Sequence, residues 1–202
     1  MISLLFGTPR CGKTTTLAYF AHRALARKTL VCGRGAWRVS LGDFAPYQHI
    51  YSTFPIRDEL GEIRQLDCSK LGKTQIENSL ILIDEVSLIF DSRDYKTFPK
   101  DAKRFFALHG HGKNDILIAS QGFEDCDKRV RNLAENLLYI ERFGRFSRIR
   151  PIQKKWSING DIVEGYILCP PLSSKYINRS KYYKMFDSYE LPELPPDNSP
   201  VW

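Results

Sequence analysis

Short apolar runs and stretches with helical spacing alternate along the first part of the chain. The apolar runs predict buried strands, because a strand covered on both faces reads as nearly continuous hydrophobic sequence. We expect strands at 2–6, 29–32, 49–52, 80–83, 115–119 and 137–142. We expect helices at 14–27, 95–108 and 127–136, the second with an apolar stripe of Phe98, Ala102, Phe105 and Phe106. This alternation predicts an α/β fold with a mainly parallel sheet flanked by helices.

The pattern changes toward the C-terminus. Two apolar stretches, 149–156 and 162–168, flank Asn159-Gly160, a dipeptide typical of a two-residue turn between antiparallel strands. They predict a C-terminal basic β-hairpin appended to the sheet, and a partly helical segment follows at 173–190. We therefore divide the chain into a core, a basic hairpin with a helical extension, and a Pro-rich tail that we expect to be flexible: residues 1–143, 144–190 and 191–202.

The positive charge is concentrated in one segment. The chain has 202 residues and a formal net charge of +7, and residues 142–184 hold ten Lys or Arg against two acidic residues. A basic segment with interleaved aromatics suits the phosphate backbone and bases of DNA, or an anionic membrane surface. The alternative is a solvated basic face without a partner. The interleaved aromatics are Trp156, Tyr166, Tyr176, Tyr182 and Tyr183.

The composition argues against membrane-spanning and disulfide-stapled classes of protein. No apolar run reaches the ~18 residues of a transmembrane helix, and the N-terminal apolar stretch lacks the basic leader of a signal peptide, so we expect a cytoplasmic protein. The five cysteines are widely spread without a C-x-x-C pair, and we interpret Cys11 as a small buried side chain rather than a reactive thiol. His109 and His111 lack a third ligand at suitable spacing, which favours an exposed loop over a metal site.

Residues 7–14 read GTPRCGKT and match the pattern G-x-x-x-x-G-K-[ST], between an apolar strand and a helix. Gly7 and Gly12 allow backbone angles that aim successive N–H groups at phosphate oxygens, and Lys13 adds a positive charge between the terminal phosphates. Thr14 is placed to bind Mg²⁺. The pattern predicts ATP and Mg²⁺ as ligands, the alternative being a glycine-rich turn with an exposed lysine. The expected nucleotide-binding residues are Gly7, Thr8, Pro9, Arg10, Cys11, Gly12, Lys13, Thr14 and Thr15.

Asp84 and Glu85 follow the apolar run at 80–83. A carboxylate at the end of this strand would bind Mg²⁺ together with Thr14. Its neighbour Glu85 would polarise the attacking water as a general base. The alternative is that the acidic pair caps the following turn.

Gln121 follows the strand predicted at 115–119. If that strand lies beside the strand at 80–83, Gln121 would point at the γ-phosphate and orient water or sense hydrolysis; otherwise it is a polar loop residue. Arg129 and Arg131 lie on the next predicted helix, where one of them is a candidate arginine finger acting across a subunit boundary. A surface helix with two arginines and no function is the alternative. The candidate catalytic residues are Lys13, Glu85, Gln121 and Arg131.

One combination of stretches is more specific than its parts: GTPRCGKT, LILIDEV, LHGHGKNDILIASQ and DKRVRNL. Together they resemble the Zot family, the filamentous-phage assembly ATPases named after the zonular occludens toxin. The likeness covers about residues 1–143, with a fainter echo in KYYKMFDSYE at 181–190. It implies a P-loop NTPase of the additional-strand type, with Walker A and Walker B motifs, that couples ATP hydrolysis to extrusion or movement of phage DNA. By motif match it assigns to the site Gly7, Gly12, Lys13, Thr14, Asp84, Glu85, Gln121 and Arg131.

The resemblance also carries expectations about partners. Many family members have a membrane-spanning helix after the ATPase domain, and this chain has no such stretch. This implies a soluble variant, or a cytoplasmic subunit peripheral at the inner membrane of the host cell that relies on a membrane-protein or virion-assembly partner. A trans-acting arginine implies a homo-oligomer, and the basic segment at 142–184 implies phage or plasmid DNA as a partner.

Two other functions remain open from the sequence. The first is a nucleoside or nucleotide kinase, in which the RVRN helix or the segment around Arg34 and Arg38 would form an arginine-rich lid over the phosphates. The second is a nucleotide-gated DNA-binding scaffold that binds ATP with little turnover. The acidic pair Asp84 and Glu85 favours a hydrolase, since a scaffold would leave this chemistry unused.

Overall fold

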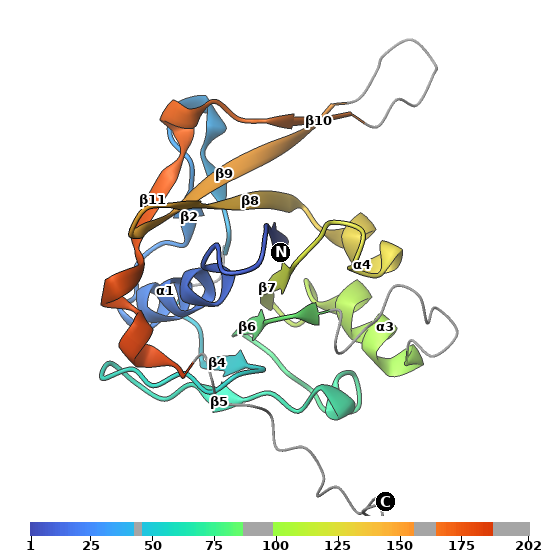
Figure 1. Ribbon diagram of the computed structural model, residues 1–202. Helices are drawn as coiled ribbons and strands as arrows, with labels where there is room; N and C mark the ends of the chain where they lie inside the picture. The colour runs from blue at the N-terminus through green and yellow to red at the C-terminus, as the bar shows by residue number, and fades with distance from the viewer. Residues whose placement is uncertain (43–45, 87–98, 156–164, 188–202) are drawn as a thin grey trace, which may run out of the picture.

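The computed structural model of the protein describes residues 1–42, 46–86, 99–155 and 165–187. Within these ranges a nine-stranded sheet has the order β10-β9-β8-β1-β7-β6-β4-β5, with β11 paired to β9 (Figure 1). Neighbouring strands from β8 to β5 are parallel, whereas β9 pairs antiparallel with β8, β10 and β11. The strands are β1 Ile2–Phe6, β4 His49–Ser52, β5 Arg64–Gln65, β6 Ser79–Ile83, β7 Asp115–Ser120, β8 Asn136–Phe143, β9 Phe146–Lys155, β10 Gly165–Leu168 and β11 Lys175–Asn178.

Helices cover both faces of this sheet. The first helix, α1, packs on one face, and α3 and α4 pack on the other (Figure 1). Their bounds are α1 Lys13–Leu25, α3 Lys100–Leu108 and α4 Lys128–Leu133. This arrangement confirms the predicted α/β fold with a mainly parallel sheet flanked by helices. None of the helices in the described ranges combines the length and apolar character needed to cross a bilayer.

The sheet is buried between the two helical layers. Leu5 and Phe20 pack in the layer of α1, whereas Leu4 and Phe106 pack in the layer of α3 and α4. Burying a side chain such as Phe106 contributes roughly 1.5–3 kcal/mol. The stripe predicted for the helix at 95–108 is buried at Ala102, Phe105 and Phe106, and Phe98 lies outside the described residues. Strand β1 is therefore held between two packed layers.

The C-terminal strands extend the same sheet. Strands β9 and β10 pair antiparallel from Leu168 opposite Ile152 to Gly165 opposite Lys155, as the predicted basic hairpin requires. The turn expected at Asn159-Gly160 lies outside the described residues. Strand β9 also forms a hairpin with β8 that was not predicted, through a two-residue turn after Phe143. Gly144 in this turn has φ of 55°, which glycine adopts without strain.

Two expectations differ from the structure. The strand expected at 29–32 is a shorter β2, Val31–Cys32, which pairs with β3, Val39–Ser40, in a separate ribbon because a turn brings the chain back on itself. The segment at 173–190, expected to be partly helical, contains two short 3-10 helices and also a strand that was not predicted, β11, whose backbone pairs with the edge of β9. The 3-10 helices are η1 Gly35–Trp37, η2 Cys68–Lys70, η3 Pro171–Ser173, η4 Arg179–Lys181 and η5 Tyr183–Met185.

Candidate nucleotide-binding site

The loop between β1 and α1 packs tightly against strands β8 and β9. Gly12 has φ of 100°, in the left-handed region that favours glycine, and a Cβ there would lie 2.1 Å from Ser147 Oγ. A Cβ on Gly7 would lie 2.2 Å from the carbonyl oxygen of Ile140. Ser147 Oγ donates a 2.9 Å hydrogen bond to the carbonyl of Cys11. These contacts explain why positions 7 and 12 are glycine, and they tie the loop to the β8–β9 hairpin.

The first residues of α1 connect this loop to β6. Lys13 is 6% exposed, and its Nζ donates to the carbonyl oxygens of Gly7 at 3.0 Å and Thr8 at 3.3 Å. Thr14 Oγ1 donates a 2.6 Å hydrogen bond to Asp84 Oδ2. Asp84 follows β6, and β7 lies between β6 and β1 in the sheet. An additional strand therefore separates the two motifs, and their side chains still meet at one edge of the sheet.

The two acidic residues after β6 lie in desolvated surroundings. Burial raises the pKa of Asp84, and the hydrogen bond from Thr14 opposes the rise. Burial and the neighbouring Asp84 charge also raise the pKa of Glu85, while Lys13 and a side-chain hydrogen bond with Gln121 oppose this. Glu85 has φ of 46°, a left-handed conformation uncommon for a residue with a Cβ. Such a conformation persists only where the surrounding structure imposes it, and residues of this kind cluster at functional sites.

Strand β7 satisfies the condition set for Gln121. It pairs with β6 on one side and β1 on the other, so Gln121 follows the strand between the two motifs. Its side chain hydrogen-bonds with Glu85, and both residues line the same cavity. The sequence interpretation placed Gln121 near the γ-phosphate, and the structure places it beside the candidate general base.

A cavity of about 790 Å³ opens beside the loop. Its volume is in the range of small-molecule sites in proteins. Four other residues expected at the site do not line the cavity: Gly7, Thr8, Cys11 and Asp84. The residues expected from sequence that line it are Pro9, Arg10, Gly12, Lys13, Thr14, Thr15, Glu85 and Gln121.

The donor atoms at this edge fit a magnesium ion. The hydroxyl of Thr14 and the carboxylate of Asp84 are hard oxygen ligands, and they are already 2.6 Å apart. Mg²⁺ prefers such oxygens and is usually held by one or two protein groups plus phosphate and water. Thr14 and Asp84 would therefore hold the ion, as the sequence predicts.

Five cavity-lining residues were not predicted to belong to the nucleotide site. They belong to the end of β8 and to the C-terminal segment, which passes beside α1, where the Tyr182 and Tyr19 rings lie 5.3 Å apart. Arg142 and Arg179 had been counted only as members of the basic segment. The five are Arg142, Arg179, Tyr183, Phe186 and Asp187.

Arg131 is held by contacts within its own chain. It forms a 2.6 Å ion pair with Glu124, and its guanidinium carbon lies 4.9 Å from the centroid of the Phe123 ring. Its side chain is 14% exposed and is not among the described residues that line the cavity. Arg129 is exposed on the same short helix. To act across a subunit boundary, Arg131 would have to exchange Glu124 for a neighbour's nucleotide.

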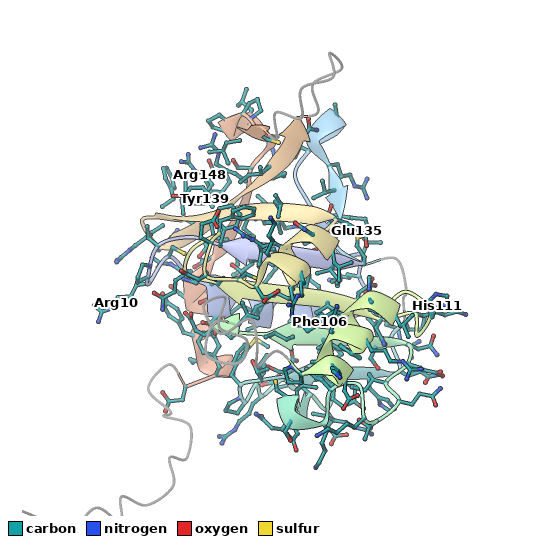
Figure 2. All side chains as sticks on the ribbon, turned by 90° about the vertical axis from the view of Figure 1, so that its right-hand side faces the viewer. Arg10, Phe106, His111, Glu135, Tyr139 and Arg148 are labelled. Atoms are coloured by element: carbon teal, nitrogen blue, oxygen red, sulfur yellow. The ribbon has the colours of Figure 1, made fainter. Side chains whose placement is uncertain are left out.

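Cys11 and the two histidines do not line the cavity. Cys11 is buried, and burial raises the pKa of its thiol, which disfavours the reactive thiolate. His111 and Arg10 lie at opposite ends of the molecule in Figure 2. His109 Nδ1 donates a 2.7 Å hydrogen bond to the carbonyl of Phe106, and burial lowers the pKa of this histidine.

Several basic residues of the segment 142–184 form ion pairs or hydrogen bonds within the protein. Arg148 Nε lies 2.8 Å and Arg150 Nη1 lies 3.2 Å from the carboxylate of Glu141. Lys175 Nζ donates to the carbonyl of Val31 at 3.2 Å. The exposed basic residues of this segment include Arg142, Arg145, Lys181 and Lys184. The surface charge of the segment is therefore smaller than its composition suggests.

We expect the substitution Asp84→Asn to stabilise the protein in the absence of nucleotide. Because burial raises the folded-state pKa of Asp84, the folded protein binds this proton more tightly than the unfolded chain does. The stability from this group is present below the unfolded pKa and is lost as pH rises through the folded pKa. At pH 8 Asp84→Asn should raise Tm, and the gain should shrink as pH falls. Thermal unfolding followed by circular dichroism measures this.

Asp67→Asn is the matched control. Asp67 is exposed at the start of η2, and hydrogen bonds from Ser69 and Lys70 hold its pKa below the usual range. Its substitution should leave Tm unchanged or lower it at pH 8. A lower Tm for Asp84→Asn than for Asp67→Asn at that pH would contradict the desolvation of Asp84.

A comparison with models of known protein families gives a match over most of the chain. A family model described as Zonular occludens toxin (Zot) matches residues 47–188. The match includes Asp84, Glu85 and Gln121 and begins after the glycine loop. It runs without a break through residues 144–188, where the likeness seen in the sequence was confined to a fainter echo at 181–190, and it includes most of the C-terminal residues that line the cavity. A comparison with curated protein sequences gives no match.

Solved structures share the fold. The N-terminal domain of zonular occludens toxin from Neisseria meningitidis is 14% identical with a TM-score of 0.54, covering 92% of this chain and 98% of that one. The genome packaging NTPase B204 from Sulfolobus turreted icosahedral virus 2, solved with AMPPCP, is 10% identical with a TM-score of 0.53, covering 84% and 97%. The protein has the P-loop NTPase fold that these structures share. Because the family model covers more than half of its residues, the chain belongs to the Zot family.

Proposed function

We propose that the protein is a Mg²⁺-dependent ATPase that couples ATP hydrolysis to the movement of phage DNA or to virion assembly. One observation carries the hydrolytic part of this proposal. The hydrogen bond from Thr14 to Asp84 joins the glycine loop to β6, and Glu85 and Gln121 meet at the same cavity. A metal site, a general base and a water-orienting amide are thus assembled around one phosphate-binding loop.

Each residue has a defined part in the proposed reaction. Lys13 and the loop N–H groups would stabilise charge on the phosphates, for which Lys13 exchanges its present contacts with the carbonyls of Gly7 and Thr8. Thr14 and Asp84 would hold Mg²⁺, which neutralises charge on the β- and γ-phosphate oxygens when bound. Glu85 would accept a proton from the attacking water.

The raised pKa of Glu85 suits its proposed role as a base. A carboxylate with an elevated pKa accepts a proton from water more readily than an ordinary glutamate does. The hydrogen bond with Gln121 orients the carboxylate, and the same amide can orient the water. Because this geometry serves hydrolysis, it favours an ATPase over a scaffold with an idle site.

The DNA and assembly part of the proposal rests on kinship and surface charge. The chain belongs to the Zot family, and a solved structure with the same fold is a genome packaging NTPase. Arg145, Lys181 and Lys184 are exposed and available to contact phosphate backbones. We propose a homo-oligomer in the host cytoplasm, working with a membrane or virion-assembly partner. Within such an oligomer Arg131 is the proposed trans-acting arginine.

Hydrolysis in the presence of DNA tests this function. Phosphate release from ATP should rise when single- or double-stranded DNA is added, with Lys13→Ala as the blank. The double variant Arg145→Ala, Lys181→Ala should require more DNA for the same stimulation, while its release without DNA stays unchanged. Release that no form of DNA alters would contradict the DNA-coupled part. Phosphate transfer to a nucleoside or nucleotide acceptor would instead indicate a kinase.

A further inference from the structure

One wall of the nucleotide cavity contains a buried arginine that no motif marks. Arg179 begins the 3-10 helix η4, and its side chain is 6% exposed. It lines the cavity together with Lys13 and Glu85. It also lies against the glycine loop, since a Cβ built on Gly12 would be 2.9 Å from Arg179 Cδ. The Arg179 side chain therefore lies beside the loop that would bind the phosphates of a nucleotide.

The hydrogen bonds of this guanidinium are incomplete. Nη1 donates to the carbonyl of Arg10 at the long distance of 3.4 Å, and Nη2 donates to the carbonyl of Gly144. Nε is buried and has no hydrogen-bond partner. No carboxylate in the described ranges forms an ion pair with Arg179.

Two arginines of the neighbouring strand β9 differ from Arg179 in having a counter-ion. Arg148 and Arg150 both pair with Glu141, so their charges are balanced within the fold. A buried cation without a counter-ion is unfavourable, and it is retained where an anion binds beside it. Phosphate oxygens are anionic acceptors that match the planar fork of a guanidinium.

We propose that Arg179 binds the phosphate chain of the nucleotide as a second cation beside Lys13, supplied by the same chain that supplies the glycine loop. The inference rests on the nucleotide site of the proposed function and does not require hydrolysis. It also gives part of the basic segment a role other than DNA binding. Since Arg179 directly follows β11, phosphate binding would fix the C-terminal segment against the loop.

Equilibrium binding of nucleotides to the full chain tests this proposal. Isothermal titration calorimetry with Mg²⁺–ATP and with AMP compares the wild type with Arg179→Met, which keeps the side-chain length and removes the charge. Loss of a charge-assisted contact should weaken ATP binding by about 10- to 100-fold. AMP carries fewer phosphates and should lose much less. Arg179→Lys, which keeps the charge without the fork, should lie between the wild type and Arg179→Met for ATP.

Lys103→Ala is the matched control. It removes one positive charge from an exposed position on α3 outside the cavity lining, so its affinity for ATP should equal that of the wild type. Thermal unfolding without nucleotide separates binding from folding. Removal of an unpaired buried charge should leave the Tm of Arg179→Met at or above that of the wild type. If Arg179→Met does not fold, Arg179→Lys decides the question by its loss of ATP affinity relative to AMP.

Two results would overturn the proposal. The first is an unchanged affinity for ATP in the folded Arg179 variants. The second is an equal loss of affinity for ATP and for AMP together with a lowered Tm, because a purely structural arginine would have this effect. Phosphate release by the wild type is measured in the same samples. A wild type that binds ATP without hydrolysing it would contradict the proposed ATPase, while the affinities would still decide the role of Arg179.

Discussion

Replacing Lys13 with Ala is expected to lower kcat/KM for ATP by at least about 100-fold. Loss of a single well-placed donor to a charged transition state costs about 10²–10³ in rate, and Lys13 supplies a full charge at the start of α1. The substitution also removes the contacts of Nζ with the carbonyls of Gly7 and Thr8, so the loop loses an internal support. Steady-state phosphate release and calorimetric titration with ATP measure the two effects separately.

Lys28→Ala is the control for this substitution. Lys28 is exposed just after the other end of α1, so its removal takes away the same charge far from the glycine loop. Its kcat/KM should equal that of the wild type. If Lys13→Ala and Lys28→Ala hydrolyse ATP equally well, the glycine loop does not bind the phosphates in the way proposed.

The substitution Glu85→Gln should abolish most hydrolysis and leave ATP bound. A general base contributes about 10²–10⁴-fold to a rate, and the amide of glutamine cannot accept the proton of water at neutral pH. Thr14, Asp84 and Lys13 are unchanged in this variant, so the affinity for ATP should stay within a few-fold of the wild-type value. Phosphate release in single-turnover experiments reports the chemical step, and calorimetry reports the affinity.

The pH profile and a matched variant complete this test. Because the pKa of Glu85 is raised, the rate of the wild type should climb with pH through a range above that of an ordinary glutamate, since only the ionised form acts as a base. Glu59→Gln changes an exposed glutamate and should retain both the rate and the profile. A Glu85→Gln variant that keeps the wild-type rate would assign the base to another group.

The parts of the site that were predicted from the sequence are those marked by a short motif or by the end of an apolar run. GTPRCGKT places its glycines, lysine and threonine within eight residues, and the apolar run before Asp84 marks the end of a buried strand. Parallel strands bring such ends to one edge of a sheet, so the meeting of Thr14 with Asp84 follows from topology. The same reasoning placed Gln121 just after a strand that would lie beside β6, and β7 meets that condition, whereas the contact of Gln121 with Glu85 was not predicted.

The parts that were missed depend on contacts between distant segments. Arg179 reaches the glycine loop because β11 pairs with the edge of β9, and no periodicity in residues 173–187 indicates that pairing. The β8–β9 hairpin was missed because its turn at Gly144 lacks the Asn-Gly signature that marks 159–160. Charge counting had the same limit, since it could not show that Arg148 and Arg150 pair with Glu141.

The most direct test of the account is phosphate release from ATP by the wild-type chain with and without Mg²⁺, alongside calorimetric binding of ATP. The arrangement of Thr14, Asp84, Glu85 and Gln121 predicts multiple turnovers that stop when Mg²⁺ is chelated and that are absent in Glu85→Gln. Tight binding of Mg²⁺–ATP without phosphate release, in the presence of either form of DNA, would contradict it.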